Sequence, residues 1–210
     1  MNIADPVLYY IHDPMCSWCW GFRSAWTAVL NKLDPAIQVQ YLLGGLAPDT
    51  DEPMPEKMRT YIRENWQQIQ QTVPGTGFNY DFWTACQPRR ATFPACRAVI
   101  ATRQQQSALD TAMVYAIQRA YYLDARNPSD NTVLIELAAE LALDKEQFTH
   151  DLSSAKTQQV LLSEIQLGHE LGVSSFPSVI LKRNETVIRL KIDYNNPEIL
   201  YSQIQHHINL

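Results

Sequence analysis

The sequence predicts a mixed α/β protein in which a helical segment interrupts a small sheet domain. Two observations support this prediction: a strand-helix-strand unit over residues 7–43, and a helix, a β-hairpin and a further helix over residues 156–208. Between them the pattern is helical throughout. We therefore expect residues 1–50 and 156–210 to form one domain and residues 51–155 to form an inserted helical domain.

The first unit begins with a short apolar run at residues 7–11, which prolines bound on both sides as expected for a buried strand. Residues 17–33 follow with apolar side chains at spacings of three and four, among them Phe22, Trp26 and Val29, which predicts a helix closed by Pro35. Residues 37–43 predict a second strand. The two strands should be parallel and joined by a right-handed crossover.

The middle segment carries several amphipathic patterns. We expect helices over residues 54–69, 93–103, 109–121, 134–143 and 145–152. Ser107 and Asp110 have the spacing of a capping box, and Asp144 with Gln147 has that of another helix N-cap.

The last unit returns to the pattern of a sheet domain. A helix from residue 156 should end at Gly172, and residues 178–181 and 186–191 should pair as a hairpin. Asn196 and Pro197 predict the start of the final helix.

Composition excludes several classes of protein. Apolar residues make up 46% of the chain and charged residues 19%, so we expect a packed core rather than a disordered chain. The net charge of -5 is spread along the chain and gives no support for nucleic-acid binding. No run of 18 apolar residues suggests a membrane span, and the N-terminus lacks the basic region of a secretory signal. With only four cysteines, we expect a cytoplasmic protein.

The strongest chemical signal is the run Cys16-Ser17-Trp18-Cys19, which follows a predicted strand and opens a predicted helix. The free N–H groups and positive dipole of a helix N-terminus stabilise a thiolate over a thiol. We therefore predict that Cys16 is a nucleophile and that Cys19, one turn later, attacks the mixed disulfide to release the substrate.

A second element strengthens this hypothesis: Ser174-Ser175-Phe176-Pro177-Ser178 places a proline directly before the predicted hairpin. A proline at the start of a strand cannot donate a hydrogen bond to the sheet and so needs another reason to be there. Together, the Cys-x-x-Cys run and this Phe-Pro pair resemble the DsbA-like proteins of the thioredoxin superfamily, which carry a helical insertion. The run from Asp13 to Phe22 is most similar to the FrnE-like branch of dithiol-disulfide isomerases.

The resemblance implies a thioredoxin-like fold and a thiol-disulfide oxidoreductase or isomerase. Phe176-Pro177 would be a cis peptide that faces Cys16 and Cys19. Phe176, Pro177 and Trp18 would bind substrate. Client proteins or small thiols would be substrates, with glutathione or a thioredoxin system as redox partner, and no organic cofactor or metal would be needed. Ser17-Trp18 differs from the central pairs of strongly oxidising periplasmic enzymes and of thioredoxins, so the net direction of exchange stays open.

Two alternatives remain. Kappa-class glutathione transferases and hydroxychromene-carboxylate isomerases share the fold, but they generally have serine where this chain has Cys16. A zinc-binding or client-holding module could use all four cysteines, although Cys86 and Cys96 are poorly spaced for a zinc site. Those two thiols are either a second redox pair or ordinary buried groups. His12 is either a residue that tunes the thiolate or a structural histidine.

Overall fold

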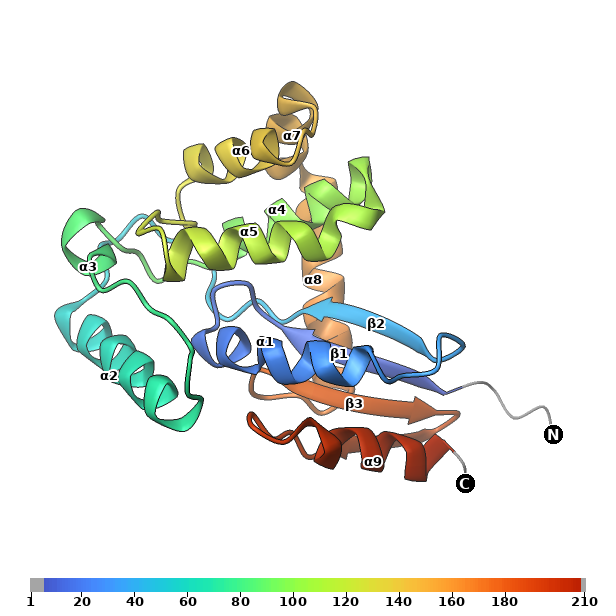
Figure 1. The fold of residues 1–210 in the computed structure, drawn as a ribbon. Coiled ribbons are helices and arrows are strands. Elements are labelled where there is room, and N and C mark those ends of the chain that lie inside the picture. The colour runs from blue at the N-terminus through green and yellow to red at the C-terminus, as the bar shows by residue number, and fades with distance from the viewer. Residues whose placement is uncertain (1–5, 209–210) are drawn as a thin grey trace.

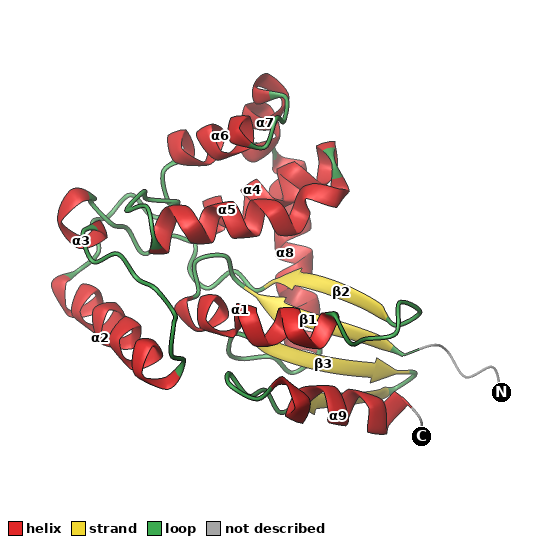
Figure 2. Cartoon of the chain, viewed as in Figure 1, coloured by secondary structure: helices red, strands yellow, loops and turns green. Residues whose placement is uncertain are grey.

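The computed structural model describes residues 6–208, which form a four-stranded sheet flanked by helices (Figures 1 and 2). The strands are β1 (Val7–His12), β2 (Gln38–Leu43), β3 (Ser178–Arg183) and β4 (Thr186–Leu190), in the order β2-β1-β3-β4. β1 pairs with β2 in parallel, and the other two pairs are antiparallel. The predicted parallel unit and the predicted hairpin are both confirmed.

Helices cover both faces of the sheet. α1 (Ser17–Leu30) and α9 (Pro197–Ile208) pack on one face, where Leu8 and Tyr10 of β1 contribute to their core. On the other face, behind the sheet in Figure 1, lies α8 (Ala155–Glu170); there Ile11 and Leu42 pack against the residues that close this helix. The alternation of β1 residues between the two cores is the period of two expected of a strand covered on both sides.

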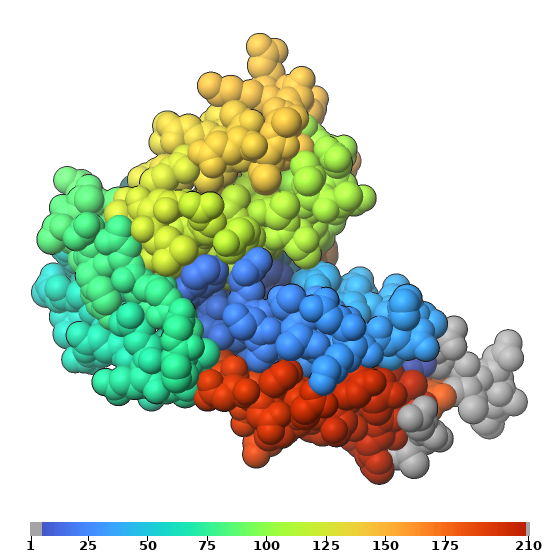
Figure 3. All heavy atoms as spheres, in the orientation of Figure 1, coloured from blue at the N-terminus to red at the C-terminus, as the bar shows by residue number. Residues whose placement is uncertain are grey.

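The remaining helices lie between β2 and α8 in the chain and stand over one end of the sheet, coloured cyan to yellow in Figure 3. They are α2 (Glu56–Thr72), α3 (Phe82–Ala85), α4 (Phe93–Gln105), α5 (Asp110–Tyr122), α6 (Asn131–Glu140) and α7 (Lys145–Leu152). Their core continues into the sheet domain, because it includes Met15 next to the cysteine run and Leu43 at the end of β2. That residues 51–155 form a separate domain stays a prediction.

Local details differ from the expectations at four places. α1 ends at Leu30, three residues before the predicted end, and α2 begins at Glu56. The short helix α3 had no predicted counterpart. The predicted capping box is wrong: Ser107–Leu109 form a 3₁₀ turn, and Asp110 instead accepts a hydrogen bond from Arg103 at 2.7 Å.

Other predicted ends are confirmed. The side chain of Asp144 caps α7 by accepting a hydrogen bond from the amide of Gln147 at 2.8 Å. Gly172 follows α8 with a φ of +77°, a conformation that glycine adopts without strain. Across residues 6–208, no helix combines the length and the apolar character needed to cross a lipid bilayer.

Candidate active site

The two cysteines of the run occupy different places at the start of α1. Cys16 is the N-cap residue, with extended backbone angles, and its sulfur accepts a hydrogen bond from the amide of Cys19 at 3.4 Å. Cys16 is 6% exposed and Cys19 only 1%, and both are free thiols. A free N–H at a helix start stabilises negative charge, so the arrangement gives an outer sulfur suited to attack and an inner one behind it.

The Phe176-Pro177 peptide is cis, as the resemblance implied, and it lies against Cys16. The carbonyl oxygen of Phe176 is 3.6 Å from the sulfur of Cys16, which donates to it. The ring of Phe176 rests directly on Gly44, just after β2, where an added Cβ would be 2.2 Å from two ring atoms. Gly44, at the end of β2, therefore contacts Phe176, and Phe176 contacts Cys16 at the start of α1.

Trp18 lies beside the pair and is half-buried. Its ring packs on Tyr194, in the loop between β4 and α9, with 5.2 Å between ring centroids. Tyr194 in turn makes an edge contact with Phe22, which is fully buried in α1. The tryptophan thus forms one wall of the site and is held there by the core.

A buried carboxylate that the sequence analysis did not single out joins the segments around the cysteines. Asp13 has no exposed surface and accepts hydrogen bonds from the amide of Met15 at 2.8 Å and that of Leu46 at 2.7 Å. It also accepts from the hydroxyl of Thr92 at 2.7 Å and the thiol of Cys96 at 3.5 Å. Burial raises the pKa of Asp13, and these hydrogen bonds oppose that rise. The sequence carried a signal for this role, because Asp13 is an acidic residue between His12 and Pro14, just before the cysteine run.

Burial sets the protonation of two groups near the site. The pKa of Cys19 is raised well above its ordinary value, first by burial and then by the neighbouring Cys16 sulfur, so its resting form is the thiol. His12 is stacked on Tyr10 with ring centroids 5.0 Å apart, and burial, with the charge of Arg103, lowers its pKa to about 3. His12 is therefore neutral at pH 7, which fits the structural interpretation of this residue.

Within the described part of the chain, the other two thiols make no hydrogen bond to Cys16 or Cys19. Cys96 is buried on α4 against Asp13, and Cys86 is half-buried with its sulfur 3.1 Å from the carbonyl oxygen of Ala125. Burial raises the pKa of both. Within the described part of the chain, no three histidine, cysteine or acidic side chains gather as a group that could hold a metal ion.

Solved structures with the same architecture include two that match nearly the whole chain. A protein from Nitrosomonas europaea, named as a candidate disulfide isomerase, is 27% identical with a TM-score of 0.85, and the match covers 98% of both chains. The cytosolic disulfide reductase DsbM from Pseudomonas aeruginosa is 25% identical with a TM-score of 0.77, over 97% of this chain and 98% of DsbM; DsbM has also been solved with GSH.

Among curated proteins, the ClpXP adapter protein SpxH of Bacillus subtilis is 24% identical over 174 residues. The match covers 82% of this chain but only 56% of SpxH, so the chain spans little more than half the length of that relative. A family model described as thioredoxin matches residues 9–203, a range that contains Cys16, Cys19, Phe176 and Pro177. The chain therefore belongs to the thioredoxin family, in a DsbA-like form with helices between its second and third strands.

Proposed function

We propose that this protein is a thiol-disulfide oxidoreductase that works through Cys16 and Cys19. One observation carries the proposal: the Cys16 sulfur lies at the N-cap of α1, between the amide of Cys19 and the carbonyl of Phe176, while Cys19 is buried behind it. Burial protects the inner thiol from external disulfides and leaves the outer sulfur for attack.

The exchange proceeds in two balanced steps. The thiolate of Cys16 attacks one sulfur of a substrate disulfide, forms a mixed disulfide and releases the other sulfur as a thiolate. Cys19 then gives up its proton to the substrate thiolate released first and attacks the Cys16 sulfur; the second substrate thiolate leaves and a Cys16-Cys19 disulfide forms. The substrate gains two electrons and the pair loses two, and oxidation of a substrate dithiol is the same sequence reversed.

Substrate binding is proposed for the surface around Phe176, Pro177 and Trp18. The backbone of Phe176 would pair with an extended substrate segment, which is the β-addition mode of peptide recognition. The half-buried Trp18 and Phe176 rings would contact apolar side chains on either side of the reacting disulfide.

We further propose that the protein acts in the cytoplasm as a member of the FrnE-like branch, with client proteins or small disulfides as substrates. Glutathione or a thioredoxin system would return electrons to the pair. The similarity to DsbM, which is named a cytosolic disulfide reductase and has been solved with GSH, favours glutathione as co-substrate and net reduction as the direction. The cysteine pair itself carries the two electrons, so the proposal needs no organic cofactor or metal.

The decisive measurement is the reduction potential of the pair, obtained from tryptophan fluorescence in glutathione redox buffers. Trp18 and Trp20 flank Cys19 in the chain, so their emission should report its oxidation. We expect a reversible two-electron transition that disappears in Cys16→Ser. A midpoint near that of thioredoxin, about -270 mV, indicates a reductase, and one well above it an oxidase or isomerase. A transition that persists in Cys16→Ser would remove the basis of the proposal.

The glutathione-dependent transferase or isomerase remains the alternative on this fold. It requires glutathione to react as a nucleophile and leaves Cys19 without a role. Turnover of a chromogenic glutathione acceptor by Cys19→Ala at the rate of the parent protein would favour it. Loss of disulfide exchange in the same variant would favour the oxidoreductase.

A further inference from the structure

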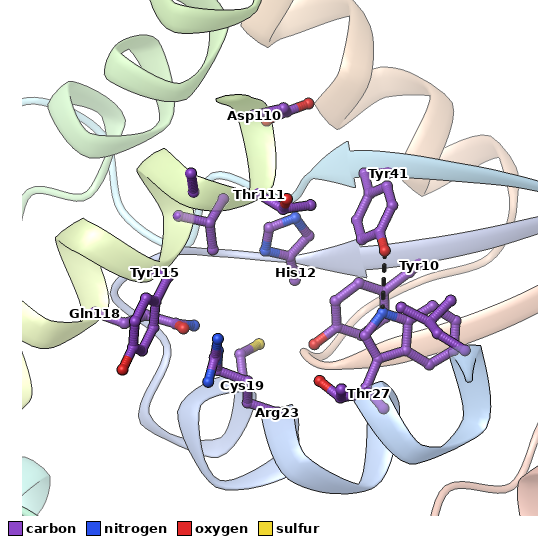
Figure 4. Close-up of a pocket in the computed structure, with 14 residues that line it drawn as sticks. Tyr10, His12, Cys19, Arg23, Thr27, Tyr41, Asp110, Thr111, Tyr115 and Gln118 are labelled. Carbon is purple, nitrogen blue, oxygen red and sulfur yellow. Dashed lines mark hydrogen bonds between the residues drawn. The ribbon is translucent and has the colours of Figure 1, made fainter. Parts of the chain in front are cut away.

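A cavity of about 350 Å³ opens between α1 and α5, on the side of Cys19 (Figure 4). Its walls come from β1, β2 and the two helices, and they include Cys19 but neither Cys16 nor the Phe176-Pro177 peptide. In Figure 4 the Cys19 side chain rises from α1 into this space, opposite Thr111 of α5. The cavity is therefore distinct from the proposed substrate surface, and its size is at the lower end of small-molecule pockets, about 300–1,000 Å³.

Four tyrosine and tryptophan rings contribute to the apolar wall, from Tyr10, Trp26, Tyr41 and Tyr115. Tyr10 stacks on Trp26 with 4.6 Å between ring centroids, and the indole N–H of Trp26 donates to the hydroxyl of Tyr41 at 3.4 Å. Tyr115 closes the opposite side from α5. Surfaces of this kind stabilise a flat ring by stacking and edge contacts.

Two polar groups of the wall lack the partners that their chemistry calls for. Arg23 lies at the exposed rim with its guanidinium 3.8 Å from the centroid of the Tyr115 ring, and it makes no ion pair with a carboxylate of residues 6–208. Gln118 is only 3% exposed, and its side-chain oxygen has almost no accessible surface and no hydrogen-bond partner, so a donor in the cavity reaches it once the amide turns toward the cavity. An unpaired buried acceptor costs roughly 1–3 kcal/mol, so a ligand that supplies a donor to it gains affinity.

The acidic side chain of the wall shares its cationic partner. Asp110 accepts a hydrogen bond from Arg103 at 2.7 Å, and Arg103 is also paired with Glu164. An anionic ligand would therefore place its charge at Arg23, which has no ion pair within residues 6–208, and away from Asp110.

We propose that this cavity binds a small aromatic acid that carries an N–H or O–H donor. The ring lies against the tyrosine and tryptophan walls, the carboxylate pairs with Arg23, and the donor bonds to the side-chain oxygen of Gln118. Such a ligand would also cover the Cys19 sulfur from the side away from the substrate surface. The proposal concerns binding alone and holds whichever direction the cysteine pair works in.

Three matched probes separate the two polar contacts. Indole-3-acetate has both the carboxylate and the N–H, 1-methylindole-3-acetate lacks the donor, and indole-3-acetamide lacks the charge. Titration calorimetry on the reduced protein should show saturable 1:1 binding of indole-3-acetate. Each analogue should bind about tenfold more weakly, the factor that corresponds to one buried or charge-assisted hydrogen bond.

Variants then locate the site. In Arg23→Met the acid and the amide should bind alike, and in Gln118→Leu the N-methyl analogue should bind like its parent. Arg23→Glu, at the same exposed position, should prefer the amide. Arg119→Gln is the matched control, because Arg119 is also on α5 but is paired with Asp124 outside this cavity.

The control Arg119→Gln should retain the difference in affinity between indole-3-acetate and each of its two analogues. Absence of saturable binding by indole-3-acetate overturns the proposal. Differences that persist unchanged in both Arg23→Met and Gln118→Leu also overturn it, since the ligand then binds elsewhere.

Discussion

Replacement of Gly44 by alanine tests how the site is assembled. The new Cβ would lie 2.2 Å from two atoms of the Phe176 ring and 2.8 Å from a third, whereas ordinary contacts are 3.4–4 Å. The amide of Gly44 is itself held by the carbonyl of His12 at 2.7 Å, so the glycine backbone is poorly placed to retreat. Phe176 must therefore move, and with it the carbonyl that contacts the Cys16 sulfur.

The expected cost follows from this overlap. Overpacking of this kind lowers the free energy of unfolding by about 1–3 kcal/mol. For a chain of this length, a loss of about 2 kcal/mol lowers the Tm by roughly 4–8 °C. A shift of about 1 Å at the substrate surface should lower kcat/KM for a peptide disulfide by about ten- to a hundredfold, since reactions are this sensitive to misplacement.

Thermal unfolding by circular dichroism and reduction of a fluorescent peptide disulfide measure the two effects. The rate at which a small reagent alkylates the Cys16 thiol in Gly44→Ala should stay within about a factor of two of the parent rate, because such a reagent does not use the Phe176 surface. Gly168→Ala is the control: its Cβ would be 3.8 Å from Ile11, an ordinary contact, and helix propensity should stabilise it by about 0.5–1 kcal/mol. Parent-like Tm and kcat/KM in Gly44→Ala would refute this account of the contact.

Three further outcomes are expected. Cys19→Ala should accumulate a mixed disulfide between Cys16 and glutathione, visible as a stable mass increase under non-reducing conditions; rapid release would contradict a resolving role for Cys19. His12 has its folded pKa lowered to about 3 from an unfolded value of about 6.5, so its contribution to stability is complete above pH 6.5 and is lost as pH falls towards 3. His12→Phe should therefore flatten the decline in unfolding free energy between about pH 6.5 and pH 4, measured in urea, and an unchanged slope would contradict this. Arg103→Gln should cost about 2–4 kcal/mol, because it strands two largely buried carboxylates, one of them Glu164, although the 28% exposure of Arg103 moderates the loss. An equal Tm in this variant would show that the carboxylates find other partners or protonate.

The elements predicted correctly from the sequence are those with a local signal. Strand β1, helix α1 and the hairpin follow from periods of two and 3.6 residues within short windows. The parallel pairing of β1 with β2 follows from the strand-helix-strand order and its right-handed crossover. The cysteine run was placed at the helix start by the same local periods. Its partner Phe176 was found only through a family resemblance, because 160 residues separate it from Cys16.

The features that the sequence did not predict depend on contacts between distant segments. Ser107 has the right spacing for a cap, but residues 107–109 form a 3₁₀ turn, and the carboxylate of Asp110 accepts a hydrogen bond from Arg103, which lies earlier in the chain on α4. The contact between Gly44 and Phe176 was not predicted, since nothing in the sequence next to Gly44 shows that an aromatic ring lies on it. The role of Asp13 was missed because its donors come from two other parts of the chain.

Those donors bear on whether the helical segment is a detachable domain. The hydroxyl of Thr92 and the thiol of Cys96, both from the segment 51–155, bind the carboxylate of Asp13, which also holds the amide of Met15 beside the cysteines. Without the segment, Asp13 would lose two of its donors and its burial, and the loop before Cys16 would lose the support of α4. The helical segment thus contributes to the site through a carboxylate in the sheet domain. The prediction of a separate folding unit for residues 51–155 has to accommodate this shared core.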